Sequence, residues 1–419
     1  MDSKTSTTRR PASTKTETAG VPRIPQEIID EILGYLAADP YFPAVDSLRS
    51  CSLVSKSWVP PCRRHLFYAV SFSSRSMVRW LKAFPAPEES PSHHVRDLRA
   101  LVGGRGRVPE CFFEVTPWFT NVERVSLLEL EGISLQAPSL WGLPPSVTSL
   151  TIKTKMFTLV EIRDLLARLP NLNDITLSGY FSVGGVPLGI GTILRGRFGG
   201  RLRILEGPAH EDTTNMFLEI PTGLRFTEVE IRCTHKLLLS TARLAEACSR
   251  TLVKLAYGIA IYGKHPLHLP VRLVPASVLM PPPNVDSAEA PERFFDFSEF
   301  PSLQEVEVEV GWAGGSLQWI PTALSTLGPT TSPRLSAIRL ELISHCAINK
   351  TIEIIPKNAG SELRRVADEL ARIEREFGGA VKLTVRRNPG FNVVFDTLDV
   401  RASFLWSERH HGSLLVRFP

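Results

Sequence analysis

The sequence has few cysteines and no long apolar run, and both absences narrow the class of protein. Its six cysteines lie far apart, at positions 51, 62, 111, 233, 248 and 346, without a Cys-x-x-Cys pair. A disulfide framework is not expected in a chain of 419 residues with this spacing, so we predict reduced thiols and a cytoplasmic or nuclear location. No run of about 18 apolar residues is present, and the N-terminal residues lack the apolar core of a signal peptide. The sequence therefore predicts neither a membrane span nor secretion.

Signatures of catalysis and of cofactor binding are also missing. There is no Gly-x-Ser-x-Gly motif and no P-loop, and the glycine-rich GIGTILRGRFGG lacks the third glycine of a dinucleotide-binding motif. The histidine pairs at 93–94 and 410–411 are adjacent in sequence, so they do not have the i, i+4 spacing of a helical metal site. Basic doublets are isolated and are not interleaved with aromatic residues. We therefore expect no enzyme, no metal or cofactor site and no nucleic-acid partner.

The composition that is present is typical of a globular protein. Hydrophobic residues make up 43% of the chain and charged residues 22%, which suffices for a sizeable core. The net charge of +5 is small for this length and predicts no clustered basic face. Residues 1–22 are rich in Ser, Thr, Lys and Arg and contain almost no large apolar side chain, so we expect this tail to be disordered.

Short helices are predicted over residues 23–70. In RIPQEIIDEILGYL, the apolar positions 28, 29, 32, 33 and 36 form one broad helix face, and Pro25 suits the first helical position. A second helix is predicted after the loop AADPYFPAVD, with Asp46 or Ser47 as its cap, and the two prolines at 60–61 end it. The side chains that recur every three or four residues along that helix are Leu48, Cys51, Val54 and Trp58. A third short piece, RRHLFYAV, leads into a strand-like AVSFS.

The order of residues in these helices resembles the F-box motif over residues 22–70. The segments RIPQEII, LRSCSLVSKSW and RRHLF carry the likeness, which is greatest to the F-box proteins of mushroom-forming fungi. In that family the helices dock on a Skp adaptor, which connects a substrate receptor to a cullin–RING ubiquitin ligase. The resemblance implies adaptor contacts by Ile24, Pro25, Ile28, Ile32, Leu48, Cys51, Val54 and Trp58. The chain departs from the shortest family members in its longer loop at 37–46, which contains two prolines.

An internal repeat follows the helices. The pattern apolar-x-x-apolar-x-apolar recurs, as in VERVSL, VTSLTI, LNDITL, FTEVEI, LQEVEV and LSAIRL. Its middle apolar residues are Leu98, Val125, Leu150, Ile175, Leu205, Val229, Leu255, Val306 and Ile338. Subtraction of these numbers gives intervals of 27, 25, 25, 30, 24, 26, 51 and 32 residues. A period of this size with one strand in each unit indicates a leucine-rich-repeat-like solenoid, although the Asn of strict repeats is mostly absent.

The segments between the strands complete the predicted fold. LVEIRDLLARLPNL and LLLSTARLAEACSRTL have helical apolar faces, and 266–293 is a proline-rich insertion that replaces or obscures one unit near residue 280. The interval 361–389 reads as a capping helix and a final strand, whereas 390–419 shows no clear pattern. We thus predict an α/β repeat protein: a disordered tail at 1–22, a three-helix F-box at 23–70, and a solenoid at 71–389 with a parallel strand ladder and outer helices. The likeness of LARLPNLNDITLSG and FPSLQEVEVEV to the repeat-like half of the fungal F-box proteins supports the same organisation.

Two functions remain open from the sequence. The first is a substrate-recognition subunit of a Skp–cullin–F-box ubiquitin ligase, in which the F-box binds the adaptor and the solenoid binds a protein target. The second is a non-catalytic repeat scaffold whose helices pack on its own solenoid and which joins no ligase. The exposure of Ile28, Ile32, Cys51, Val54 and Trp58 distinguishes them, because an exposed apolar patch indicates a partner site.

Overall fold

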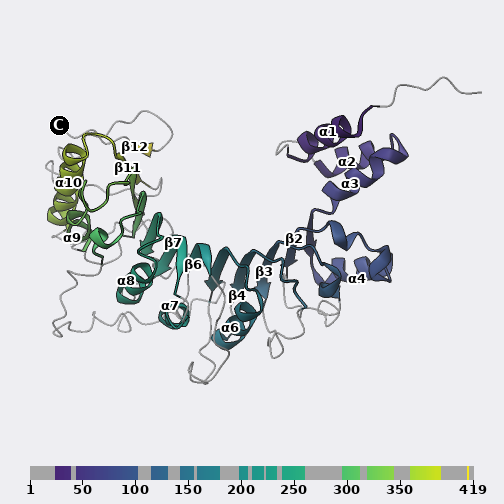
Figure 1. Cartoon of the computed structure of the whole chain (residues 1–419), viewed down its shortest axis with the longest axis horizontal. Coiled ribbons are helices and arrows are strands. Elements are labelled where there is room, and N and C mark those ends of the chain that lie inside the picture. The colour runs from purple at the N-terminus through teal and green to yellow at the C-terminus, as the bar shows by residue number, and fades with distance from the viewer. Residues whose placement is uncertain are drawn as a thin grey trace, which may run out of the picture. The chain divides into compact units, whose positions relative to one another are not determined.

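The computed structural model divides the chain between Tyr68 and Ala69 into two compact units, which we describe separately (Figure 1). The tail at 1–22, the insertion at 266–293 and all of 390–419 except 413–414 lie outside the described residues. The structure describes residues 24–38, 44–101, 115–130, 142–154, 158–179, 198–205, 210–220, 223–233, 238–259, 295–311, 319–343, 359–387 and 413–414.

The first unit consists of short helices around a small core. Its elements are α1 (Gln26–Ala38), α2 (Ala44–Ser52), the 3₁₀ turn η1 (Lys56–Trp58) and α3 (Val59–Leu66). Four buried side chains form the centre of the core, Ile29, Leu33, Leu48 and Cys62. Leu36, Ala37, Cys51, Trp58 and Leu66 pack around them and are partly buried. We refer to this part as the helical unit.

The prediction for the second helix is wrong at both ends. The helix α2 begins at Ala44, so Asp46 lies in its first turn, and it ends at Ser52 rather than continuing to Trp58. Ser55 then caps the short turn η1, because its side chain accepts a hydrogen bond from the backbone of Ser57. The two prolines begin α3 instead of ending its predecessor, since the first helical positions have no intrahelical N–H bond to lose.

The second unit is built on one long sheet. Within the described residues the sheet has twelve strands in sequence order; β1 to β11 run parallel, and β12 pairs antiparallel with β11 (Figure 1). The strands are β1 (Ala69–Phe72), β2 (Asp97–Leu101), β3 (Arg124–Leu130), β4 (Ser149–Thr154), β5 (Asp174–Gly179), β6 (Gly199–Leu205), β7 (Arg225–Cys233), β8 (Lys254–Ile259), β9 (Glu305–Gly311), β10 (Ala337–Ile343), β11 (Lys382–Arg387) and β12 (Ser413–Leu414). This arrangement confirms the predicted parallel ladder of an α/β repeat fold.

Apolar side chains on one face of the sheet form continuous rows. The first buried row comprises Leu98, Val125, Leu150, Ile175, Leu202, Val229, Leu255, Val306 and Ile338, none of them more than 2% exposed. The row passes through Leu202 and not Leu205, so the sequence alignment of that unit was wrong by three residues. With Leu202 the neighbouring intervals become 27 and 27 residues instead of 30 and 24. The strand β8 pairs directly with β9, so the long interval between them inserts no strand at that point of the ladder.

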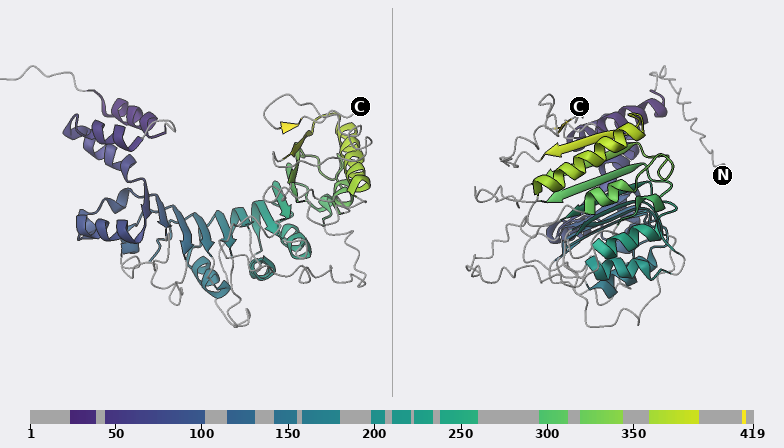
Figure 2. Two further views of the ribbon diagram at one scale, coloured as in Figure 1. Left: turned by 180° about the vertical axis from the view of Figure 1, so that it is seen from behind. Right: turned by 90° about the vertical axis from the view of Figure 1, so that its left-hand side faces the viewer.

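Helices cover the apolar face of the ladder. They are α4 (Ser74–Ala83), α6 (Leu159–Arg168), α7 (His210–Leu218), α8 (Leu238–Ala247), α9 (Trp319–Ser325) and α10 (Ala359–Glu376). In α6, four leucine and isoleucine side chains predicted to share a face are buried, and a capping box between Thr158 and Glu161 begins the helix. The views from both sides show α6, α7 and α8 along one side of the strands (Figure 2). The opposite face of the sheet, which we call the open face, carries the alternate residues of each strand.

Hydroxyl side chains just before the strands connect successive repeats. Ser146 Oγ donates to the Val122 carbonyl at 2.8 Å, and Thr251 Oγ1 donates to the Phe226 carbonyl at 3.0 Å. Ser336 Oγ donates in the same way to the Gln304 carbonyl at 3.1 Å. Each bond spans about one period, and the accepting carbonyls lie just before β3 and β9 or at the start of β7. The side chains of Asn121 and Asn171 make contacts of the same kind, because they donate to the carbonyls of His93 and Pro145 at 2.9 and 2.8 Å.

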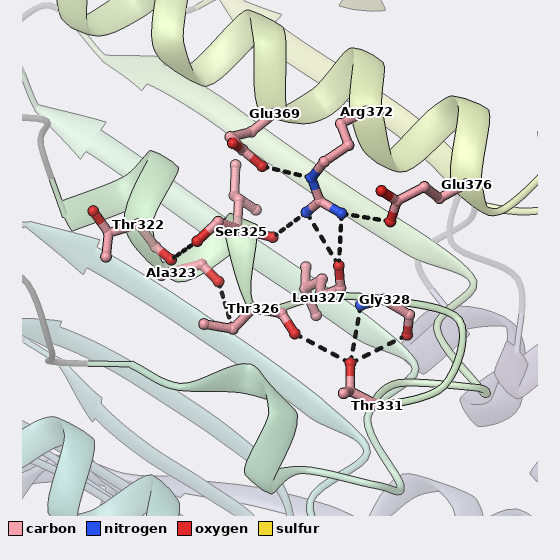
Figure 3. Close-up of polar contacts among 11 residues, drawn as sticks. Thr322, Ala323, Ser325, Thr326, Leu327, Gly328, Thr331, Glu369, Arg372 and Glu376 are labelled. Atoms are coloured by element: carbon pink, nitrogen blue, oxygen red, sulfur yellow. Dashed lines mark hydrogen bonds and ion pairs between the residues drawn. The ribbon is translucent and has the colours of Figure 1, made fainter.

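A different set of contacts packs a helix at each end of the ladder. At the first strand, Trp80 of α4 contacts Phe72, Phe84 and Phe119, with ring centroids 5.0–5.9 Å apart. At the other end, Arg372 of α10 reaches the end of α9 (Figure 3). Its guanidinium donates to the Leu324 carbonyl at 2.9 Å and to the Leu327 carbonyl at 3.1 Å.

Two carboxylates hold Arg372 in place. Glu369 and Glu376, one turn before and after it on α10, accept from its remaining donors (Figure 3). The last carbonyls of a helix lack intrahelical partners, so this arginine caps α9 from a neighbouring helix. The contact attaches the predicted C-terminal helix to the body of the ladder.

Candidate functional site

Exposed large apolar side chains concentrate in the helical unit. Nine are exposed among the described residues, and eight of them lie between residues 24 and 68. They are Ile24, Ile28, Ile32, Tyr35, Val45, Leu53, Val54 and Tyr68, and the ninth is Val78 on α4. Among the described residues, the much longer ladder unit thus exposes one such side chain and the helical unit exposes eight.

The helix α1 has apolar residues on two faces. Ile29 and Leu33 point into the core and are 3% and 0% exposed. Ile28 and Ile32 are one turn apart on α1 and lie about 100° around the helix from Ile29 and Leu33, and Ile24 precedes the helix by two residues. Ile28 is 45% exposed and Ile32 is 39% exposed. We call these three side chains the isoleucine line.

Pro25 follows Ile24 in the sequence and precedes the first residue of α1. Its carbonyl accepts hydrogen bonds from the backbone N–H groups of Ile28 and Ile29, at 3.2 and 3.3 Å. Pro25 is thus the residue before the first helical position rather than the first position itself, because α1 begins at Gln26. Its ring is exposed beside Ile24.

A second exposed apolar group lies in the turn after α2. Leu53 and Val54 are 86% and 67% exposed, the first and third highest values of the exposed group. The backbone of this turn is held by bonds from Leu53 and Val54 to the carbonyls of Ser50 and Cys51, both at 3.1 Å. The two side chains are therefore presented on an ordered turn.

The predicted contact residues separate into two groups in the structure. Ile24, Pro25, Ile28, Ile32 and Val54 are exposed. Leu48 is 2% exposed and belongs to the core, so its side chain offers no surface to a partner. Cys51 and Trp58 pack against that core and are partly buried. Helical spacing alone did not separate the groups, because α1 and α2 carry apolar residues on more than one face.

The sequence pattern also missed exposed residues. Tyr35 and Leu53 are 72% and 86% exposed but were not among the predicted contacts. Tyr35 follows Ile32 by three residues and so extends the isoleucine line. The apolar pair Leu53-Val54, immediately before the cap residue Ser55, was the available signal for the turn.

Burial shifts the pKa values of several groups around the core. Burial, followed by the nearby Arg64, lowers the pKa of His65 below its ordinary value. Burial, with the neighbouring Cys51, raises the pKa of the Cys62 thiol. In the ladder, burial raises the pKa of Cys248 to about 12. Thiols with raised pKa values are poor nucleophiles, so we assign Cys62 and Cys248 a packing role in the core and no reactive role.

Opposite charges alternate along one row of the open face. Register partners across the strands are, in order, Asp97, Arg124, Ser149, Asp174, Arg201, Glu228, Lys254, Glu305, Ala337 and Lys382, which we call the charge row. Ion pairs within it include Arg201–Glu228 at 2.6 Å and Lys254–Glu305 at 3.2 Å. Unlike charges directly opposite each other favour a register, so this row supports the ladder itself.

The next two open-face rows are also ion-paired over β6 to β10. Arg203 contacts Glu230 at 3.3 Å, and Arg339 contacts Glu307 at 3.8 Å. Arg232 on β7 reaches Glu309 on β9 at 3.4 Å, although β8 lies between them. This contact passes over Gly258, where an added Cβ would lie 3.2 Å from Glu309 and 3.3 Å from Arg232. A side chain at this position would therefore press on both partners of the ion pair.

Other kinds of site have little support among the described residues. They contain no group of three or more His, Cys, Asp or Glu side chains that could hold a metal ion, and none of their helices is long and apolar enough to cross a membrane. A cavity of about 210 Å³ between α9 and α10 is lined by Thr322, Ser325, Arg365, Asp368 and Glu369. Glu369 forms an ion pair with Arg372, so the side chains that line this cavity belong to the packing contact between α9 and α10.

Compared with models of known protein families and with curated proteins, the chain matches none of them. The functional assignment therefore depends on the physical features of the two units. The strongest of these is the unequal distribution of exposed apolar side chains.

Proposed function

We propose that the chain is the substrate-recognition subunit of a Skp–cullin–F-box ubiquitin ligase. In this proposal the helical unit binds a Skp adaptor and the open face of the ladder binds a protein target. The observation that carries it is the isoleucine line together with the exposed turn at Leu53-Val54. The resemblance of residues 22–70 to the F-box motif supplies the identity of the partner.

The exposed apolar surface has a physical explanation in a missing partner. Apolar area removed from water contributes about 25 cal/mol per Å², so a helix with a second apolar face gains stability only when that face is covered. Contiguous exposed apolar patches on a soluble protein mark interaction sites. A specific interface of standard size buries about 800 Å² on each partner, and the exposed apolar side chains would form the centre of such a surface.

The proposed contact set is refined by the burial of each residue. Ile24, Pro25, Ile28, Ile32 and Val54 contact the adaptor directly, and Tyr35 and Leu53 join them. Trp58 and Cys51 pack against the core. The Cys51 carbonyl also accepts the hydrogen bond from the Val54 N–H group that orders this turn. Leu48 is excluded as a direct contact because it is buried.

The proposed contribution to ubiquitin transfer is proximity and not chemistry. A receptor that binds both the adaptor and the target raises the local concentration of target lysines near the charged enzyme. This role requires two separate binding surfaces and no catalytic residue. The isoleucine line and the open face of the ladder are the two candidate surfaces.

Co-expression with a fungal Skp adaptor tests the proposal. We expect the full chain to co-purify with the adaptor in a 1:1 complex on size-exclusion chromatography. Ile28→Asp should abolish the complex, because it places a charge in a desolvated interface. Val78→Asp is the matched control, since Val78 on α4 is 44% exposed and Ile28 on α1 is 45% exposed.

Circular dichroism of both variants establishes that they are folded. Trp58→Ala is not a suitable test variant, because Trp58 packs against the core and its removal would disturb the helical unit itself. No complex from a folded wild-type chain would contradict the proposal. The non-catalytic repeat scaffold would then be the better description.

A further inference from the structure

A carboxylate, that of Glu31, borders the exposed apolar surface of α1. At about 100° of rotation per residue, Glu31 lies about 40° around the helix from Tyr35 and about 60° from Ile28. It lies about 160° from the buried Ile29 and Leu33, so it is on the side of α1 that faces away from the core. A partner that covers the apolar side chains of this helix therefore also approaches Glu31.

Glu31 has no cationic partner in the described part of the chain. The residue is exposed, and its side chain forms neither an ion pair nor a hydrogen bond with the described residues. The helix α1 contains Glu27, Asp30 and Glu31 but no lysine or arginine. Glu27 precedes Glu31 by four residues, and two like charges at this spacing destabilise a helix.

The other two acidic residues of α1 have explanations within the helix. Glu27 lies in the first turn, where the helix dipole favours a negative charge. Asp30 accepts a hydrogen bond from the Gln26 side chain at 2.9 Å. Glu31 lies in the second turn, beyond the range of the dipole effect, and its charge is repelled by Glu27. Neither the helix dipole nor the core thus accounts for a carboxylate at position 31.

Binding at the isoleucine line would remove water from this carboxylate. Burial of a charge is costly without a partner charge, and a charge-assisted hydrogen bond to lysine or arginine offsets that cost. We propose that the adaptor places a lysine or arginine side chain against Glu31, so that this ion pair fixes the orientation in which α1 docks. The inference rests on the proposed function of the helical unit and specifies the chemistry of the surface that covers it.

The affinity of the full chain for a purified fungal Skp adaptor, measured by titration calorimetry, tests the inference. Glu31→Gln keeps the shape of the side chain and removes its charge, so we expect binding to weaken about tenfold at about 50 mM salt. Glu31→Lys places a cation against a cation, and we expect a loss of about a hundredfold. The loss in Glu31→Gln should shrink at about 500 mM salt, because salt screens the wild-type ion pair.

Glu246 on α8 provides the matched control. It is also an exposed helical carboxylate without an ion pair to the described residues, and it lies in the ladder unit. Glu246→Gln and Glu246→Lys make the same changes of net charge, and we expect each to change the affinity less than about twofold. Circular dichroism of all four variants establishes that they are folded.

Three results would overturn the inference and leave the proposed function in place. Tighter binding by Glu31→Gln would show that the adaptor removes water from this carboxylate without supplying a cation. Unchanged binding by Glu31→Gln would place Glu31 outside the interface. Equal losses in the matched variants of Glu31 and Glu246 would indicate a general effect of net charge.

Two further results would contradict both the inference and the proposed function. The first is the absence of adaptor binding by the folded wild-type chain. The second is a dimer of the wild-type chain alone in sedimentation velocity that Ile28→Asp dissociates, because a second copy of the chain would then be the occupant of this surface.

Discussion

The helical unit and the ladder unit differ in where they place apolar side chains. In the ladder, each strand directs alternate residues into rows that neighbouring repeats and helices bury, and Val78 is the one large apolar side chain exposed among its described residues. The helical unit has four fully buried core residues and eight exposed large apolar residues. A unit of about 45 residues cannot bury all the apolar surface of three short helices. Among the described residues, the ladder unit thus buries nearly all of its large apolar side chains, whereas the helical unit leaves many of them exposed.

The largest expected effect comes from the core of the helical unit. Leu33→Ala removes a fully buried side chain, so we expect a loss of about 2–5 kcal/mol in the unfolding free energy of that unit. Hydrogen exchange should then accelerate in α1 to α3 and remain unchanged in β3 to β10. Ile32→Ala, one residue away but on the exposed side, should cost less than about 1 kcal/mol. Equal effects of the two substitutions would contradict the two-faced description of α1.

The next effect concerns the end of the ladder. Arg372→Ala removes five hydrogen bonds to four partner residues and leaves the carbonyls of Leu324 and Leu327 without these donors. We expect a cost of about 1–3 kcal/mol in urea unfolding of the full chain. Arg375→Ala on the exposed side of α10 should cost less than about 0.5 kcal/mol. A cost for Arg372→Ala no larger than for Arg375→Ala would show that the cap of α9 contributes little.

A smaller effect is expected at Gly258. The Cβ of Gly258→Ala would press on Arg232 and Glu309 and displace their ion pair, so we expect a cost of about 1 kcal/mol. Glu309→Gly removes both atoms of Glu309 that this Cβ would approach, the Cβ at 3.2 Å and Oε2 at 3.3 Å. In that background, Gly258→Ala should cost measurably less in urea unfolding, since the two positions are in contact. Additive costs would show that the two side chains do not meet over Gly258.

The smallest effect is a pH dependence confined to the helical unit. The pKa of His65 is lower in the folded chain than its ordinary value of 6.5. The unfolded chain therefore binds more protons near this pH, and stability falls as the pH decreases through about 6.5. Hydrogen exchange of α3 at pH 7.5 and pH 5.5 measures this change. His65→Gln should reduce the dependence, and an unchanged dependence in that variant would assign it to other groups.

Much of the ladder could be predicted from the sequence because its signal is local and repeated. Eight of the nine predicted marker residues lie in the buried row, from Leu98 on β2 to Ile338 on β10. The exception was Leu205, because Gly199 stands where the pattern has its first apolar residue, three positions before Leu202. Strand pairing corrected that error, since register is a property of neighbouring strands and not of one segment.

The candidate site was less predictable. The sequence pattern identified the apolar positions of the helical unit but not the side of each helix that would be buried. Leu48 and Ile28 look alike in sequence, yet one is 2% exposed and the other 45%. We predicted that the prolines at 60–61 end the second helix, but they lie in the first turn of α3. The charge row could not be found before the register was known, because neighbouring members such as Arg124, Ser149 and Asp174 lie 25 residues apart in sequence.

The most direct measurement for the account is the affinity of the full chain for a purified fungal Skp adaptor, by titration calorimetry. We expect a dissociation constant in the micromolar range or below with a negative heat-capacity change, which is the signature of buried apolar surface. Ile28→Asp should weaken binding at least about a hundredfold, and Val78→Asp should leave it within about twofold. Equal losses in the two variants, or no binding by the folded wild-type chain, would contradict the claim that the isoleucine line is an adaptor surface.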